Sequence, residues 1–211
     1  MNKLIPLMLA TAAWATLAGA QAPAPAAAQG PSEIVETAAQ AMLKDLDANR
    51  DAYRKDPSKV DALVEKNLLP HFDTQYAAQL VLGKHWRDAN PEQRKRFIDA
   101  FYHSLLRNYG NALVDFTGDR LKVFPLKADS NADRATVRTE VKRSDGTRVP
   151  VSYSLHKTPD GWKAWDVVIE GISYVKSFRE DFGAEIDAKG LDVVIDRIEK
   201  GATPVAVQKA K

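Results

Sequence analysis

Apolar residues in the first half of the chain recur every three or four positions, which is the period of amphipathic helices. Between residues 35 and 46 this spacing predicts a first helix that begins with Ser32 as its N-cap and ends near Tyr53. Two shorter amphipathic helices follow, and we expect Asp56 and Asp73 to cap them. The N-terminal part of the domain is therefore predicted to be helical.

The longest predicted helix carries the clearest start signal. Asn90 is a favoured N-cap, Pro91 takes the first helical position, and Gln93 stands where a capping-box side chain reaches back. The helix then carries one apolar stripe that is rich in aromatic side chains: Phe97, Phe101, Leu105, Tyr109, Leu113 and Phe116. This stripe must lie on a large apolar surface, either as core packing against a sheet or, in part, as the wall of a cavity.

After Gly118 the hydrophobic period changes to two, the period of half-buried strands. Four strands are predicted as a curled antiparallel meander with one apolar face, over residues 121–123, 135–141, 149–155 and 165–169. Turn residues at 144–146 and 158–161 join the last three of them. Pro150 cannot donate a hydrogen bond to a neighbouring strand, so we expect the third strand to be an edge strand or to bulge there.

A further helical part is predicted after Gly171, with a break at Gly190 and a short final helix. The order of helices, curled sheet and helices indicates an α+β fold.

The two ends of the chain look different from its middle. Residues 1–20 read as a cleaved secretory signal, with Lys3 before an apolar stretch and a small-residue cleavage site. We divide the chain into that signal, an Ala/Pro-rich linker over 21–31, a single domain over 32–202 and a disordered tail over 203–211. The mature protein is expected to be soluble.

Composition excludes several function classes. The 211 residues contain 30 Lys and Arg against 28 Asp and Glu, for a formal net charge of +2, so nucleic acid is not an expected partner. The absence of cysteine excludes a disulfide framework, a thiolate metal site, a cysteine nucleophile and a lipid-modified N-terminal cysteine.

Motifs for catalysis are also missing. The four histidines show no metal-ligand spacing, and no phosphate-binding loop or nucleophile elbow is present. Asp166 falls inside the fourth strand on the face opposite Trp165, where we expect a solvated outward position. The alternative is a buried carboxylate that acts as a general base, for which no acid or base partner can be named.

Several spaced segments together resemble one known family. They are LLPHFD at 68–73, LVLGKHW at 80–86, the Pro-x-Gln-Arg helix start at 91–94 and W-x-x-W-D-V-V-I-E-G-I-S at 162–173. In order and spacing they resemble the MlaC, or toluene-tolerance, family of periplasmic phospholipid-binding proteins. The resemblance extends over nearly all of residues 33–200.

This resemblance implies a soluble carrier of the Mla pathway. Such a carrier shuttles glycerophospholipid between an outer-membrane lipoprotein–porin complex and an inner-membrane ABC transporter with a ring of MCE domains, and so maintains outer-membrane lipid asymmetry. It implies an NTF2-like cone whose helices close an apolar cavity, a periplasmic monomer, no cofactor beyond the lipid cargo, no metal and no catalytic residue.

The same resemblance suggests which side chains line the cavity. They come from the apolar sheet face, the stripe of the long helix and the segment after Gly171: Val81, Leu82, Phe97, Phe101, Leu105, Tyr109, Val137, Val151, Tyr153, Trp165, Val167, Ile169, Ile172 and Val175. Each of these positions is equally compatible with simple core packing.

Two other function classes stay open at this point. One is a small-substrate enzyme of the NTF2-like cone type, with Asp166 or a tyrosine as the base. The other is a periplasmic chaperone or adaptor, although the mature chain is poor in the methionine that promiscuous peptide grooves favour.

Overall fold

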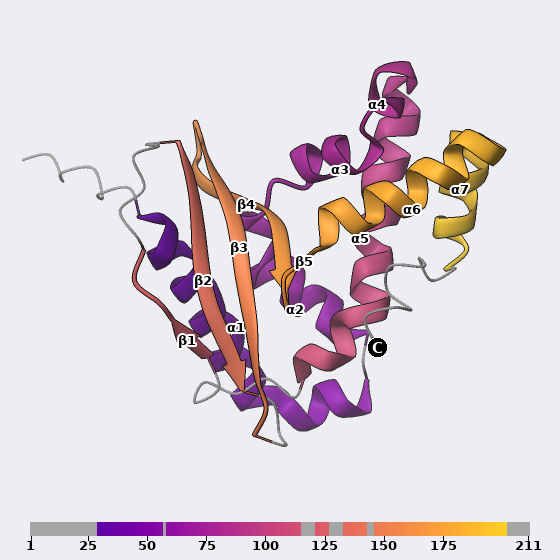
Figure 1. The fold of residues 1–211 in the computed structure, drawn as a ribbon. Coiled ribbons are helices and arrows are strands. Elements are labelled where there is room, and N and C mark those ends of the chain that lie inside the picture. Colours follow the sequence, from indigo (N-terminus) through magenta and orange to yellow (C-terminus); the bar gives the residue numbers. More distant parts are fainter. Residues whose placement is uncertain (1–28, 57, 115–120, 127–132, 143–145, 202–211) are drawn as a thin grey trace, which may run out of the picture.

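The computed structural model describes residues 29–56, 58–114, 121–126, 133–142 and 146–201, without the side chains of 108–113 (Figure 1). The predicted signal peptide, most of the linker and the tail lie outside these residues. The elements are α1 (Pro31–Lys55), α2 (Lys59–Asn67), the 3-10 turn η1 (Leu69–His71), α3 (Thr74–Leu82), α4 (His85–Asp88), α5 (Pro91–Val114), β1 (Leu121–Val123), β2 (Arg134–Lys142), β3 (Arg148–Thr158), β4 (Gly161–Ile169), β5 (Ile172–Ser173), α6 (Tyr174–Lys189) and α7 (Leu191–Glu199). The predicted α+β order is confirmed.

Two helices begin at residues other than those predicted. Helix α1 starts at Pro31 with Gly30 as its N-cap, so Ser32 lies inside the first turn. Proline is favoured in the first turn because its missing N–H has no intrahelical partner there. Helix α2 starts after Ser58, whose N–H and hydroxyl both donate to the Asp56 carboxylate, so Asp56 anchors the preceding turn instead of capping the helix.

The other two predicted helix starts are confirmed. Asp73 caps α3 by accepting a 2.8 Å hydrogen bond from the backbone N–H of Tyr76. Asn90 and Gln93 form a reciprocal capping box at the start of α5, in which each side chain accepts from the backbone N–H of the other at 2.8 and 3.0 Å.

Among the described residues the sheet has five antiparallel strands in sequential order, one more than the pattern predicted. The additional strand β5 pairs Ile172 with Ile169 of β4. Glu170 and Gly171 connect them with φ angles of +51° and +83°, which is the backbone of a two-residue type I′ hairpin. A strand of two residues is too short to show an alternating pattern in the sequence.

The expectation for Pro150 is wrong. Strand β3 is central, between β2 and β4, and the register shift of its ladder lies between Ser154 and Leu155. The carbonyl of Pro150 accepts a 3.0 Å hydrogen bond from the N–H of Glu170, just beyond the end of β4. The nitrogen of Pro150 faces β4, as its carbonyl does. Its missing N–H therefore falls just beyond the end of the β3–β4 ladder.

The two faces of the sheet differ in burial. Helix α1 crosses one face, behind the sheet in Figure 1, and we call this the inner face. There Val35 of α1 packs with Val137, Leu155 and Ala164 from three different strands. The opposite, outer face lies toward the viewer and carries the exposed alternate residues of β2.

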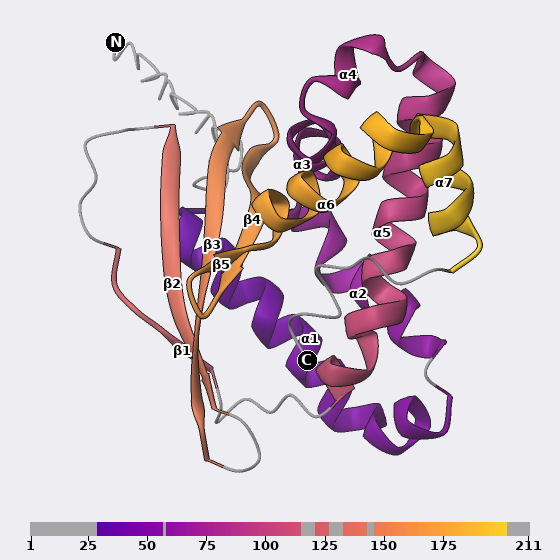
Figure 2. The same ribbon diagram turned by 45° about the vertical axis from the view of Figure 1, so that its right-hand side comes forward.

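A helical layer lies beside the sheet, beyond β4 (Figure 2). Its core joins α3, α5, α6 and α7 and contains four phenylalanines. Phe97 and Phe101 stack with ring centroids 5.7 Å apart, and Phe178 and Phe182 meet Phe101 edge-on at 5.0 and 5.9 Å. Such aromatic pairs each contribute about 0.5–1.5 kcal/mol beyond burial.

A third apolar cluster joins α1 and α2 to α5 and includes Leu46, Val60 and Leu106. Within the part of the chain that the structure describes, no helix has both the length and the hydrophobicity of a membrane span.

Candidate functional site

The side chains predicted to line a cavity divide into two groups by burial. Six are packed inside the cores with 0–7 % of their surface exposed: Val81, Leu82, Phe97, Phe101, Val137 and Val151. Six others are half-buried: Leu105, Tyr153, Trp165, Val167, Ile169 and Val175. Ile172 is 56 % exposed at the β4–β5 hairpin, and the side chain of Tyr109 lies outside the described residues.

The accessible members of the sheet form one continuous band on its inner face. Tyr153 of β3 pairs with Val167 of β4, and Ile169 pairs with Ile172 of β5. Val167 and Ile169 are two residues apart and therefore share a face. The inner face is thus closely packed in its middle, at Val137, and keeps accessible apolar surface toward β4 and β5. We call these four residues the β4–β5 band: Tyr153, Val167, Ile169 and Ile172.

Tyr153 shows how this band is built. Its ring keeps accessible surface although it lies on the inner face of a central strand. Burial raises the pKa of its hydroxyl, opposed by a hydrogen bond from the side chain of Thr139. The hydroxyl is thus desolvated while the residue as a whole stays half-buried.

Residues with the same partial burial, in the helices or at their ends, surround the three cores. At the margin of the α3–α5–α6–α7 core lie Leu105, Tyr174 and Val175. At the margin of the α1–α2–α5 core lie Leu68 and Tyr102, and Phe72 lies at the margin of the sheet core. Two of them are tied to β4: Phe72 pairs with Ala164, and the N–H of Val175 donates to Asp166. The accessible apolar surface therefore lies on both sides of β4, where the sheet meets the helices.

The solvated position predicted for Asp166 is wrong. Only 5 % of its surface is exposed. One carboxylate oxygen accepts from the hydroxyl of Ser173 at 2.6 Å and the other from the N–H of Val175 at 3.0 Å. Asp166 thus fixes the start of α6 against β4. Because both oxygens already accept hydrogen bonds from the protein, this arrangement gives the carboxylate a structural role and lends no support to a general base.

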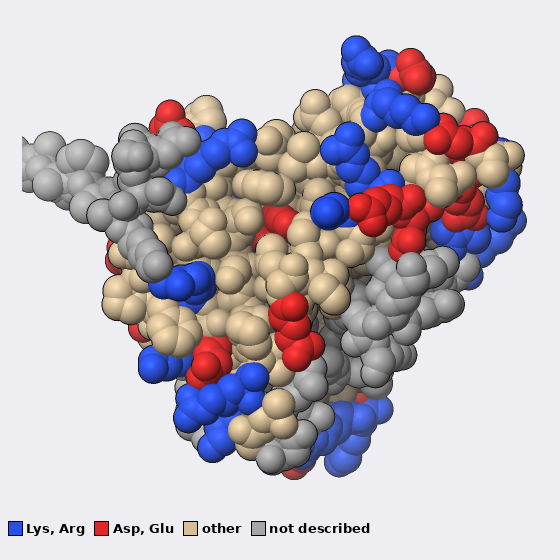
Figure 3. All heavy atoms as spheres, viewed as in Figure 1, with Lys and Arg blue, Asp and Glu red and all other residues tan. Residues whose placement is uncertain are grey.

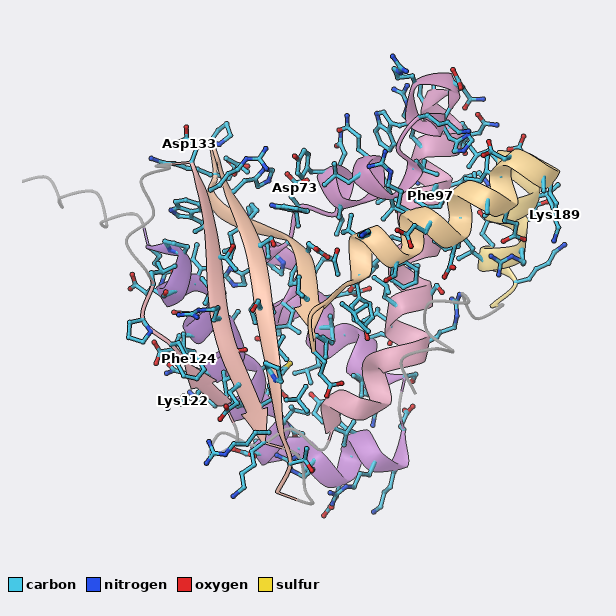
Figure 4. All side chains as sticks on the ribbon, viewed as in Figure 1. Asp73, Phe97, Lys122, Phe124, Asp133 and Lys189 are labelled. Carbon is cyan, nitrogen blue, oxygen red and sulfur yellow. The ribbon has the colours of Figure 1, made fainter. Side chains whose placement is uncertain are left out.

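A polar and aromatic cluster joins the sheet to α3 near Asp73, which is labelled in Figure 4. The imidazole of His156 lies 3.0 Å from the carboxylate of Asp73 and stacks on Tyr76 at 4.6 Å. Trp165 meets Tyr76 edge-on at 5.8 Å, and its indole nitrogen is buried without a hydrogen-bond partner among the described residues. These contacts hold α3 on β4 and leave Trp165 half-buried at the rim of the apolar surface.

A separate groove of about 570 Å³ lies between α1 and β1, at the other edge of the sheet. Its helical side is polar and its strand side is apolar; the lining residues are Ser32, Glu36, Gln40, Leu43, Leu121, Val123, Phe124 and Pro125. Figure 4 labels Phe124 there, with the ammonium of Lys122 4.8 Å from its ring. None of the predicted lining residues belongs to this groove. The sequence pattern predicted the strand of Leu121 and Val123 but not the groove beside it.

No metal site is found among the described residues, since no three His, Asp or Glu side chains lie close enough to hold an ion.

Comparison with known proteins identifies the family. The family model described as MlaC protein matches residues 36–200. The chain belongs to the MlaC family. Among curated relatives, the toluene tolerance protein ttg2D of Pseudomonas putida is 34% identical over 173 residues, which is 81% of this chain and 80% of that protein. The intermembrane phospholipid transport system binding protein MlaC of Haemophilus influenzae is 22% identical over 82% of each chain.

A solved structure shares the fold. The phospholipid-binding protein of Ralstonia solanacearum, in complex with a phospholipid, aligns with a TM-score of 0.74 and 26% identity, and the match covers 84% of this chain and 97% of that one. The fold that this MlaC-family chain adopts therefore holds a phospholipid in a neighbour that matches nearly throughout.

Proposed function

We propose that this protein is a soluble carrier of glycerophospholipid, which holds acyl chains in the apolar space between the sheet and the helices. The observation that supports it most strongly is the phospholipid bound by the Ralstonia solanacearum neighbour. The half-buried apolar side chains on both sides of β4 supply a surface of matching character in this chain.

The β4–β5 band, Leu105 and Val175 would contact the chains directly, with Trp165 at the rim. Behind these side chains, a layer of buried residues would form the wall of the lipid site: Val81, Leu82, Phe97, Phe101, Val137 and Val151. This layer would contact the lipid only where binding of the lipid widens the space. Tyr109 extends the same stripe of α5.

A carrier of this kind needs no catalytic group. At about 0.8 kcal/mol per buried methylene, two acyl chains of about fifteen methylenes each resist release into water by on the order of 24 kcal/mol. A pocket that matches the bilayer interior removes this barrier, because the lipid passes from one apolar environment to another.

The family membership supports a place for this chain in the Mla pathway. The carrier would work in the periplasm after cleavage of residues 1–20 and would shuttle lipid between an outer-membrane lipoprotein–porin complex and an inner-membrane ABC transporter with an MCE ring. In this way it would maintain outer-membrane lipid asymmetry. The direction of net transport would come from ATP hydrolysis in the transporter, since the carrier itself binds lipid by passive burial.

Native mass spectrometry of periplasmically expressed protein, followed by solvent extraction, tests the carrier function. We expect near-stoichiometric glycerophospholipid that survives dilution. A protein that emerges empty, and that takes up no phospholipid from vesicles after controlled delipidation, would refute the proposal and favour a small-substrate enzyme. Co-purifying polypeptide instead of lipid would favour a chaperone.

Two neighbouring variants locate the cargo on the inner face. Ile169→Glu places a carboxylate in the β4–β5 band, and burying that charge beside acyl chains is costly, so we expect loss of most bound lipid. Val168→Glu is the matched control, because the adjacent residue points to the outer face. Equal lipid retention by both folded variants would contradict the assignment of the band.

A further inference from the structure

The outer face of the sheet carries a concentration of positive charge that the lipid cavity does not use. Five exposed cations from three strands share this face: Lys122, Arg134, Arg138, Lys142 and Arg148. Blue side chains are spaced along the β1 and β2 side of the molecule in Figure 3. The whole chain has a formal net charge of only +2, so positive charge is gathered on this face and is not spread evenly.

Strand alternation and register set the positions of these cations. Arg134, Arg138 and Lys142 lie at even spacing on β2, where the residues between them, such as Val137, are buried on the inner face. At about 3.4 Å per residue they span roughly 27 Å. Lys122 pairs with Glu140 across to β1, and Arg148 pairs with Lys142 across to β3, so the cations form a row along one side of the outer sheet face.

Little negative charge offsets this row among the described residues. Glu140 shares the face and forms an ion pair with Arg148. Asp166 also points to this side, but it is buried and both its oxygens are occupied. At the end of the row, the guanidinium of Arg134 lies 3.5 Å from the hydroxyl of Tyr76. The carboxylate of Asp73 is close by, but it pairs with His156, the strand partner of Arg134.

The neutral residues between the cations indicate the kind of partner. Thr136, Ser152 and Ser154 are small and polar, and the exposed large apolar side chains, Leu126, Ile172 and Val193, lie outside β2 and β3. Protein interfaces are anchored by buried aromatic or aliphatic side chains at their centre. A sheet face with a row of exposed cations, and with no exposed large apolar side chain on β2 or β3, fits an anionic surface that attracts it through charge.

We infer that the outer sheet face docks the protein on the headgroups of an anionic phospholipid bilayer. Each Lys or Arg near such a surface strengthens binding about fivefold, and salt screens the attraction. The β4–β5 band, which contacts the proposed cargo, lies on the inner face of the same sheet, so docking by the outer face leaves this band unobstructed. This inference does not depend on the cargo, because it concerns the opposite face.

Vesicle flotation of the full protein tests the docking face, with phosphatidylglycerol-rich vesicles compared with pure phosphatidylcholine. We expect binding to the anionic vesicles only, falling steeply as salt rises. The variant Arg134→Gln/Arg138→Gln/Lys142→Gln should bind on the order of 100-fold more weakly, at about fivefold per cation.

The control Lys44→Gln/Arg87→Gln/Lys200→Gln removes the same charge from exposed positions outside the sheet and should bind nearly as well as the parent protein. Circular dichroism must show that both variants are folded. The inference would be overturned if both variants bound anionic vesicles equally weakly. It would also be overturned if the parent protein bound neutral vesicles as strongly as anionic ones. Retention by soluble polyglutamate but not by anionic vesicles would also overturn it and assign the face to an acidic protein.

Discussion

Single residues show where charge and hydrogen bonding decide the local structure. Asp166 is the clearest case, because its two oxygens accept from Ser173 and from the N–H of Val175 and so start α6. Strand alternation placed it on the face opposite Trp165, but the β3–β4 ladder shifts register there and leaves Trp165 without a ladder partner between Ala164 and Asp166. The pattern also could not reveal that a helix begins against Asp166. The burial of this carboxylate is set by a segment several residues further along the chain.

Asp166→Asn should therefore lower stability. An amide replaces one acceptor by a donor that faces an existing donor, and the loss of a charge-assisted hydrogen bond in a buried site costs about 1.5–3 kcal/mol. Urea unfolding measures this change. Asp160→Asn, at an exposed turn, is the control and should change stability by less than about 0.5 kcal/mol. Equal stability of the two variants would show that Asp166 does not anchor α6.

Tyr53 makes stability depend on alkaline pH. Its hydroxyl donates a 2.6 Å hydrogen bond to Asp45, and burial, followed by this bond and the charge of Asp45, raises the pKa of Tyr53 from 10.0 to about 12. The folded protein thus holds the phenolic proton more tightly than the unfolded chain. The resulting stability is fully present below about pH 10 and is lost as pH rises through about 12.

Unfolding midpoints measured across this alkaline window check the effect. Tyr53→Phe should lose less stability than the parent protein between about pH 10 and 12. Some loss should remain, because burial also raises the pKa of Tyr102 to about 12. Parallel pH profiles for the two proteins would contradict the role given to Tyr53.

At the scale of elements, the sequence predicts best where the signal is local. The Asn90–Gln93 box and the Asp73 cap lie within one turn of the helices they start, and both are confirmed. Pro150 was misplaced because its tolerance depends on where the neighbouring strand ends, which is a property of the sheet. Strand β5 was missed because its two residues carry no period.

The β4–β5 hairpin gives two substitutions with opposite expected signs. Glu170 adopts φ +51°, which side chains other than Gly, Asn and Asp disfavour, so Glu170→Asn should raise stability by about 0.5–1 kcal/mol. Gly171 has φ +83° and open space where a Cβ would lie, so Gly171→Ala should cost about 1–2 kcal/mol from backbone strain alone. Thermal unfolding of both variants checks this, and shifts of the same sign would argue against a type I′ turn.

At the scale of the whole molecule, family and fold class were accessible from sequence, whereas the division of the site was not. An apolar stripe looks the same whether it packs in a core, as at Phe97, or stays half-buried, as at Ile169. That distinction depends on how three clusters from distant parts of the chain meet. The groove between α1 and β1 was missed for the same reason, since its two sides lie far apart in the sequence.

The central claim is that the lipid chains lie between the inner sheet face and the helices on either side of β4. Photo-crosslinking tests it most directly, with a phospholipid that carries a diazirine in one acyl chain, loaded into the protein and mapped by peptide mass spectrometry. The account predicts adducts at Tyr153, Val167, Ile169 or Val175. Adducts confined to the groove between α1 and β1, or to the outer sheet face, would contradict it.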